Sequence, residues 1–294
     1  MKPARTARST GIIVALAAFF IAALLLVPSA RAQADPQIET PQPLNSIAVS
    51  LVVFVIVFSG AVVGRVLRRA VPEDHLGSDA KDVVKLATGL VVTMCALVLG
   101  MLVSSAKSSY DERKNEVALM SSQILNIERL LENYGPETKE PRDELRVQVQ
   151  AALDRIWPQQ KSREAQLRPT ESTQAYYNKL RLLEPKSELQ ASLKAEAIAM
   201  SASLRQTRWL LFLEAEQTSV PLPLLVILVA WLTVIFVSFG LFAPPNLTVT
   251  VTLFVSAMAV SAAIFIIMEM YSPFSGVLRI SSAPIQEALS QMGH

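Results

Sequence analysis

Residues 217–268 have the sequence QTSVPLPLLVILVAWLTVIFVSFGLFAPPNLTVTVTLFVSAMAVSAAIFIIM, a run of 52 residues without a charged side chain. A helix needs about 20 apolar residues to cross the roughly 30 Å hydrocarbon core of a bilayer, so this run is long enough for two spans. Pro244 and Pro245 divide the run, because consecutive prolines cannot continue a helix. The sequence therefore predicts a transmembrane hairpin over residues 220–269. Its two spans are expected at about 220–242 and 247–268.

Two shorter uncharged runs upstream predict a first transmembrane hairpin, over residues 47–103. Its spans are expected at about 47–67 and 83–103, with a short polar loop between them. The 25 residues of 270–294 form a C-terminal tail after the last span. The chain is thus expected to cross a lipid bilayer four times.

The N-terminal region has the pattern of a secretory signal. Lys2, Arg5 and Arg8 precede an apolar stretch, and small residues near Ala32 and Ala34 offer cleavage sites. We interpret residues 1–34 as a cleaved signal peptide. An uncleaved signal anchor is the alternative, and it would add a fifth span. Residues 35–46 are rich in proline and are expected to form an extended linker.

The charged residues are concentrated in the middle of the chain. Of 27 basic and 25 acidic residues, 17 of each sign lie between Lys107 and Glu216. Apolar residues in this region recur at three and four positions, which is typical of amphipathic helices, and no segment alternates as a strand would. Neither glycine nor proline occurs between Met101 and Tyr134, so span two is expected to continue into the first of these helices. The predicted fold class is all-α: four transmembrane helices and a helical bundle, residues 104–219, inserted between the hairpins.

Four apolar stripes define the expected helices of the bundle, and Ser187 with Gln190 matches a capping box at the start of the fourth. Gly135-Pro136 is a stop signal at the end of the first. The stripes consist of Val117, Met120, Ile124, Ile127, Leu131 and Tyr134; of Leu145, Val149, Ala152 and Ile156; of Tyr176, Leu180 and Leu183; and of Leu189, Leu193, Ala197, Met200, Leu204 and Leu211.

Basic residues near the span ends predict the orientation. Arg65, Arg68 and Arg69 cluster at the end of span one, and cytoplasmic loops carry an excess of Lys and Arg. The loop between spans one and two is therefore expected inside, and the helical bundle outside.

Catalysis finds little support in the sequence, and we expect no enzyme. The two histidines, His75 and His294, lie in a loop and at the terminus, and neither a Cys/His cluster nor a glycine-rich phosphate loop occurs. The sequence accordingly predicts no catalytic residue, no metal site and no cofactor. Without a basic patch interleaved with aromatics, no nucleic-acid partner is expected either.

One face of span two carries a stripe of small and mildly polar residues, Gly89, Thr93, Ala96, Gly100 and Ser104. Small residues permit close packing between helices in lipid. The alternative is that several copies of this helix line a narrow pore.

Glu269, an acid at the end of span four, is either functional, as intramembrane ionisable groups often are, or in contact with interfacial water.

Several blocks resemble the bestrophin-like domain family of bacterial membrane proteins. They are the stretch from Lys81 to Asp111, the segments 132–138 and 239–244, the motif Pro273-Phe274-Ser275-Gly276, and residues 279–284. The resemblance covers nearly all of the chain from residue 47. It implies similarity to bestrophins, four-span proteins that assemble as pentameric ion channels with the second span at the pore.

The resemblance thus implies a homo-oligomer in the bacterial cytoplasmic (inner) membrane, with ions as the transported species and the stripe on span two facing the axis. Two features differ from the pattern. Bestrophins follow their Pro-Phe element with an acidic calcium-binding run, whereas Pro273-Phe274 here precedes Ser275-Gly276, and Tyr271 stands where the family tends to have Asp. Bestrophins also keep the large domain in the cytoplasm, whereas the charge pattern places it on the periplasmic side. The alternative function is a membrane-anchored interaction or sensor protein whose bundle binds a partner.

Overall fold

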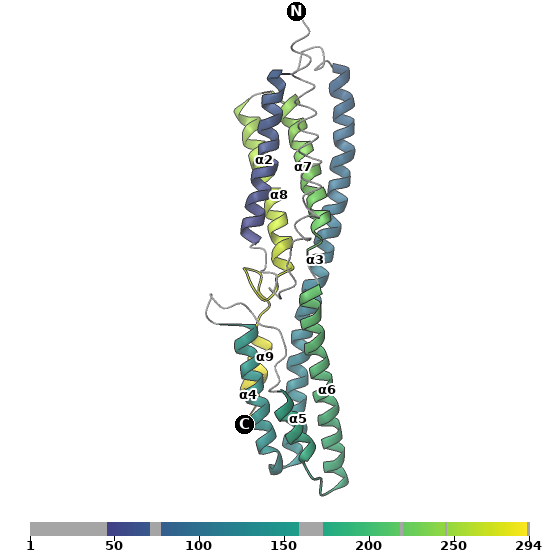
Figure 1. Ribbon diagram of the computed structural model, residues 1–294, viewed down its shortest axis with the longest axis vertical. Helices are drawn as coiled ribbons and strands as arrows, with labels where there is room; N and C mark the ends of the chain where they lie inside the picture. The colour runs from purple at the N-terminus through teal and green to yellow at the C-terminus, as the bar shows by residue number, and fades with distance from the viewer. Residues whose placement is uncertain (1–45, 71–77, 159–172, 218–219, 245, 293–294) are drawn as a thin grey trace, which may run out of the picture. The chain divides into compact units, whose positions relative to one another are not determined.

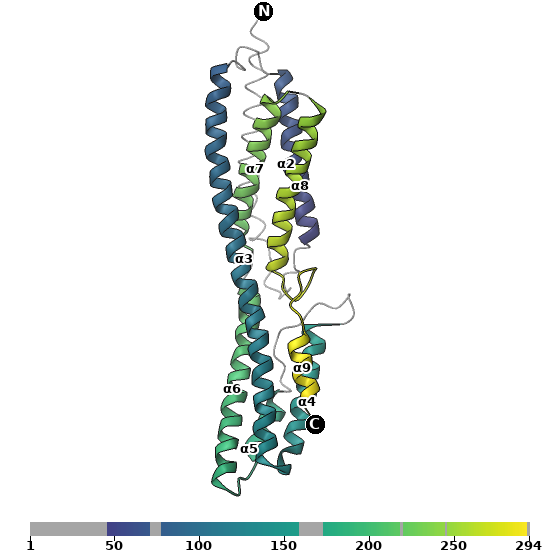
Figure 2. The ribbon, with the colours of Figure 1, turned by 180° about the vertical axis from the view of Figure 1, so that it is seen from behind.

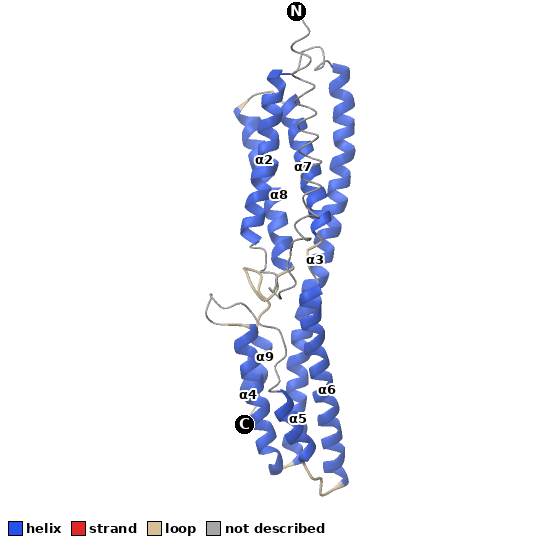
Figure 3. Ribbon diagram, in the orientation of Figure 1, coloured by secondary structure: helices blue, strands red, loops and turns tan. Residues whose placement is uncertain are grey.

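The structure, a computed structural model, describes residues 46–70, 78–158, 173–217, 220–244 and 246–292. In these residues every regular element is a helix, which confirms the predicted all-α class (Figure 3). The helices are α2 (Ser46–Ala70), α3 (Ser78–Tyr134), the 3-10 turn η2 (Pro136–Thr138), α4 (Lys139–Ile156), α5 (Thr173–Leu182), α6 (Glu188–Gln217), α7 (Leu222–Phe242), α8 (Leu247–Met270) and α9 (Ala283–Gln291). The expected signal peptide, and the linker except for Ser46, lie outside the described residues.

Four of the described helices, α2, α3, α7 and α8, are long and apolar enough to cross a bilayer, judged by their length and composition. The most apolar 18-residue window in each has a mean hydropathy of at least 2.4. α7 ends at Phe242 and α8 begins at Leu247, so the break falls at the prolines as predicted.

α3 is one helix of 57 residues, so span two continues without interruption into the charged region. At about 1.5 Å per residue its length is about 85 Å. The helix ends at Tyr134 because Gly135 has a φ of 130°, a conformation that favours glycine, and Pro136 follows. The hydroxyl of Thr138 then donates to the carbonyl of Leu131 in the last turn of α3.

The chain divides into two compact units. We call residues 1–106 with 220–268 the span unit, and residues 107–219 with 269–294 the bundle unit. The first contains α2, the N-terminal half of α3, α7 and nearly all of α8. The second contains the rest of α3, α4, α5, α6 and α9.

In the span unit α2 packs against α7 through glycines (Figures 1 and 2). A Cβ atom added at Gly64 would lie closer than 3.0 Å to the carbonyl group of Val237, and one at Gly240 equally close to that of Ala61. Real Cβ atoms essentially never approach other atoms so closely. The two backbones therefore meet because no side chain stands between them, as is common between helices in lipid. α2 also contacts α8, where the rings of Phe54 and Phe58 lie edge-on to Phe254.

The bundle unit encloses a hydrophobic core formed by facing helix stripes. Every member of the first predicted stripe is buried, with exposed fractions between 0% for Ile127 and 6% for Met120. The second stripe differs at one position: Leu153 is buried, whereas the expected Ala152 is only half-buried. Leu189 of the fourth stripe is 68% exposed, because it lies in the first turn of α6, at the end of the bundle. Of the remaining positions in the third and fourth stripes, four are buried, Tyr176, Leu180, Ala197 and Leu211, and four are half-buried, Leu183, Leu193, Met200 and Leu204.

The start of α6 is tied to the end of α3. The Ser187 hydroxyl accepts from the backbone N–H of Gln190 at 3.1 Å, the first half of a capping box. The Gln190 side chain accepts from the N–H of Lys186 at 2.7 Å, one residue before the position that the motif predicts. Its amide also donates to the carbonyl of Tyr134 at 2.9 Å. The Gln190 side chain thus forms hydrogen bonds both at the start of α6 and at the end of α3.

Candidate functional site

The predicted stripe on α3 is exposed along its whole length. All five members, from Gly89 to Ser104, are exposed, and neither Gly89 nor Gly100 has a neighbour within 4 Å of the place a Cβ would occupy. The buried residues of the same segment, Cys95 and Leu102, lie on another face of the helix. In the described part of this single chain, the stripe therefore has no helix packed against it.

The membrane segment of α3 is also the least covered of the four. In its most apolar window 11% of the residues are buried, compared with 28% in α2 and α8 and 33% in α7. Next to the stripe lies a row of large apolar side chains, Leu90, Leu97 and Met101, all more than half exposed. α3 thus presents a small, mildly polar face and a large apolar face, both left uncovered by the described part of the chain.

The arginines after span one contact the turn between α7 and α8. Arg68 donates to the carbonyl oxygen of Ala243, and Arg65 donates to the hydroxyl of Thr250 at 2.9 Å. The last carbonyls of a helix lack partners within the helix, and the prolines after Ala243 bring no N–H. The Arg68 guanidinium therefore satisfies a carbonyl at the end of α7, a role that the charge pattern alone did not predict. The contact also places the end of α2 and this turn on the same side of the span unit.

Glu269 holds the loop that follows α8. Its side chain is 3% exposed, and its Oε2 accepts from the backbone N–H groups of Val277 and, at 3.1 Å, Leu278. Gly276 has a φ of 80°, and a Cβ there would lie closer than 3.0 Å to the carboxylate. Of the two roles considered for Glu269, the described contacts are those of a structural anchor. The carboxylate accepts hydrogen bonds from the backbone, and Gly276 leaves space for it because glycine has no side chain.

The motif Pro273-Phe274-Ser275-Gly276 forms this anchored loop. Phe274 is buried and packs edge-on against Trp157 at 5.7 Å between ring centroids. The Trp157 indole N–H donates to the carbonyl of Ile280 at 2.9 Å, and the N–H of Ile280 donates to the carbonyl of Pro273 at 2.8 Å. The motif thus fastens the C-terminal segment to α4 within the bundle unit.

Several ionisable groups of the bundle unit are used in structural contacts. Arg142 donates two hydrogen bonds to one oxygen of Glu128, at 2.8 and 2.6 Å, and this partner raises the pKa of the Arg142 guanidinium. Burial raises the pKa of Tyr176 to about 12. Within the described ranges, no three His, Cys, Asp or Glu side chains gather in a way that could hold a metal ion.

The sequence matches the bestrophin-like domain family over residues 52–285, well over half of the chain. The chain belongs to that family. The matched region of this bestrophin-like chain extends from α2 into α9, so it includes the stripe on α3, Glu269 and the anchored loop. Four apolar helices and this family membership make it a membrane protein. No curated protein and no solved structure matches the chain.

Proposed function

We propose that this bestrophin-like protein assembles as a homo-oligomeric ion channel in which α3 of each copy lines the pore. The observation that supports this assignment is the uncovered stripe on α3, small and partly hydroxylated, on the least buried of the four spans. Helix faces left open by one chain are the faces that further copies can cover. Family membership points to the same class of protein.

The stripe suits a narrow conduit for a physical reason. Glycine and alanine keep the helix backbone close to the axis, and the hydroxyls of Thr93 and Ser104 can contact a hydrated ion. Leu90 and Leu97, on the neighbouring face, can then contact lipid or the next copy. In a ring, each copy would offer one face of α3 to the axis and other faces to its neighbours.

A matched pair of substitutions tests the pore. Ala96→Phe places a ring on the stripe, whereas Leu97→Phe places the same ring on the exposed apolar face next to it. Purified protein in liposomes should pass ions; we expect Ala96→Phe to lower the flux about tenfold or more, and Leu97→Phe to leave it within about twofold, because only the first ring occludes the conduit. The measurement is ion flux followed with an entrapped dye. Equal flux in the two variants would contradict the pore assignment.

The oligomeric state is an independent requirement. Light scattering or native mass spectrometry of the protein in lipid nanodiscs should give several copies per particle. A single copy per particle would rule out a pore made of α3 helices. An oligomer without ion flux would favour a membrane-anchored interaction protein instead.

We also propose that the bundle unit lies on the periplasmic side of a bacterial cytoplasmic membrane. Moving the charges of Arg65, Arg68 and Arg69 outward opposes the membrane potential by about 2.3 kcal/mol per charge per 100 mV. The contact of Arg68 with Ala243 supports placing the short α7–α8 turn on the same, cytoplasmic side. Alkaline phosphatase, active only outside, should therefore be active when fused after Gly135 and inactive after Gly77. The reverse pattern would place the bundle unit inside.

A further inference from the structure

A cavity of about 280 Å³ lies within the bundle unit, between α4 and α6. Its wall is largely apolar, with Ile124, Leu145 and Leu153 among the aliphatic side chains and Trp157, Tyr176 and Trp209 among the aromatic ones. Small-molecule sites typically combine such a lining with a few placed polar groups. A water molecule's share of the liquid is about 30 Å³, so the cavity holds on the order of ten non-hydrogen atoms.

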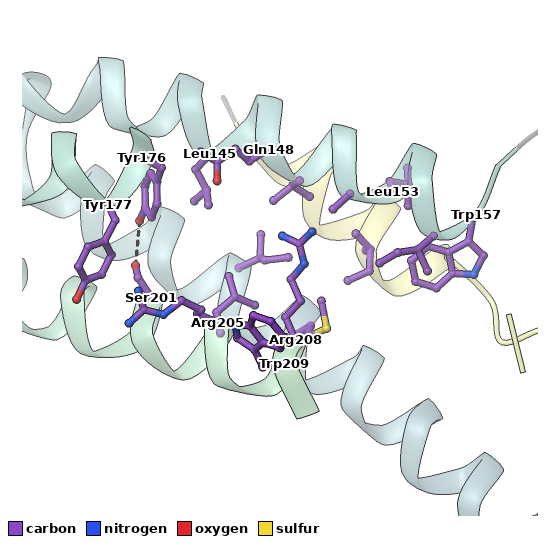
Figure 4. A pocket seen from close by; sticks show the side chains of 17 residues that line it. Leu145, Gln148, Leu153, Trp157, Tyr176, Tyr177, Ser201, Arg205, Arg208 and Trp209 are labelled. Atoms are coloured by element: carbon purple, nitrogen blue, oxygen red, sulfur yellow. Dashed lines mark hydrogen bonds between the residues drawn. The ribbon is translucent and has the colours of Figure 1, made fainter. Parts of the chain in front are cut away.

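Two cationic side chains, Arg205 and Arg208, line this space. Figure 4 shows Arg208 extending from α6 toward α4, in the middle of the lining residues. Its Nε is buried and has no hydrogen-bond partner in the described part of the chain. The described ion pairs do not include it. A buried charge without a counterion is costly, so the arrangement favours an anion that enters from outside.

Arg205, Tyr176 and Ser201, which also line the cavity, have contacts of their own. Arg205 lies over the ring of Tyr177 at 5.1 Å, and Arg181 lies over the same ring at 5.0 Å. The Tyr176 hydroxyl is 3.1 Å from the Ser201 hydroxyl, a hydrogen bond drawn in Figure 4. Burial lowers the pKa of the Arg208 guanidinium, and the positive charge of Arg155 lowers it further. A bound anion would therefore lower the positive electrostatic potential at Arg208.

We propose that this cavity binds a small organic carboxylate with an apolar body, whose carboxylate pairs with Arg208. A guanidinium matches a carboxylate with two parallel hydrogen bonds, and the apolar wall replaces water around the rest of the molecule. The volume fits a molecule about the size of an aromatic acid or a medium-chain fatty acid. The proposal concerns the bundle unit alone and does not depend on whether the span unit conducts ions.

A series of ligands that share one ring and differ in charge tests the site without altering the protein's fold. Trp157 and Trp209 both line the cavity, so a Trp231→Phe background leaves two reporters at the site. The full chain in lipid nanodiscs is titrated with benzoate, benzyl alcohol and benzylamine, with empty nanodiscs as the blank. Benzoate should change the tryptophan fluorescence saturably, and the neutral and cationic analogues should bind at least about tenfold more weakly, since a charged hydrogen-bonded partner is worth that much or more.

Arg208→Gln should weaken benzoate binding about tenfold or more while leaving benzyl alcohol unchanged. Arg146→Gln, which removes an exposed guanidinium from α4, is the matched control and should leave benzoate binding as it is. Equal affinity for benzoate and benzyl alcohol, or an undiminished affinity in Arg208→Gln, would overturn the proposal. Glu164 and Glu171 lie outside the described residues. Benzoate binding that appears only in the double variant Glu164→Gln with Glu171→Gln would also overturn the proposal, because Arg208 would then pair with a carboxylate of the chain itself.

Discussion

Gly64→Ala should greatly lower the yield of folded protein in the membrane. The added methyl group would meet backbone atoms of Val237 and Leu241 on α7, and a backbone cannot turn away as a side chain can. The helices would have to separate, which would also open the contact between Gly240 and Ala61. Overpacking of a tight interface typically costs about 1–3 kcal/mol, and for backbone against backbone we expect roughly 3 kcal/mol or more.

The measurement is the yield of monodisperse protein after extraction, together with a thermal midpoint. Cys95 is the only cysteine of the chain and is buried, so a thiol-reactive dye reports unfolding of the span unit. Gly89→Ala is the matched control, because its Cβ position is open and alanine favours a helix by up to about 1 kcal/mol. A normal yield and midpoint for Gly64→Ala would show that α2 and α7 do not pack as described.

Glu269→Ala should destabilise the bundle unit by roughly 3 kcal/mol or more, the second large effect. The substitution leaves the N–H groups of Val277 and Leu278 without their acceptor, and hydrogen bonds to a charged group contribute about 1.5–3 kcal/mol each. Release of the loop would also loosen Phe274 from Trp157. The expected signature is a lower midpoint in thermal unfolding followed by tryptophan fluorescence.

Two variants separate this anchoring role from a general effect of charge. Glu269→Gln keeps an acceptor oxygen in place and should lose less than half as much stability. Glu287→Ala removes an exposed acid from α9, and surface substitutions usually change stability by less than about 0.5 kcal/mol. If Glu269→Ala behaved like Glu287→Ala, the loop would not depend on the carboxylate.

The cavity around Arg208 was not predicted from the sequence, although the position of Arg208 in the helical pattern indicates a buried charge. Arg208 lies four residues after Leu204 and three before Leu211, so it falls on the apolar stripe of α6. Arg113 lies four residues before Val117, at the start of the apolar stripe of α3, and is 1% exposed. A charge on an apolar stripe indicates a buried ionisable group, but its partners come from other helices and do not appear in the local pattern.

The amino-acid sequence by itself determined the all-α class, the presence of four long apolar helices, the breaks at Gly135 and Pro244, and the buried seam of α3. These features depend on apolar length and on the helical period, and both are properties of neighbouring residues along one chain. Tertiary structure decided which of two similar glycine patterns is packed: Gly60 and Gly64 lie against α7, whereas Gly89 and Gly100 lie open. The same holds for Glu269, because a glycine permits close approach and a carboxylate accepts hydrogen bonds only where the fold brings a second backbone within reach.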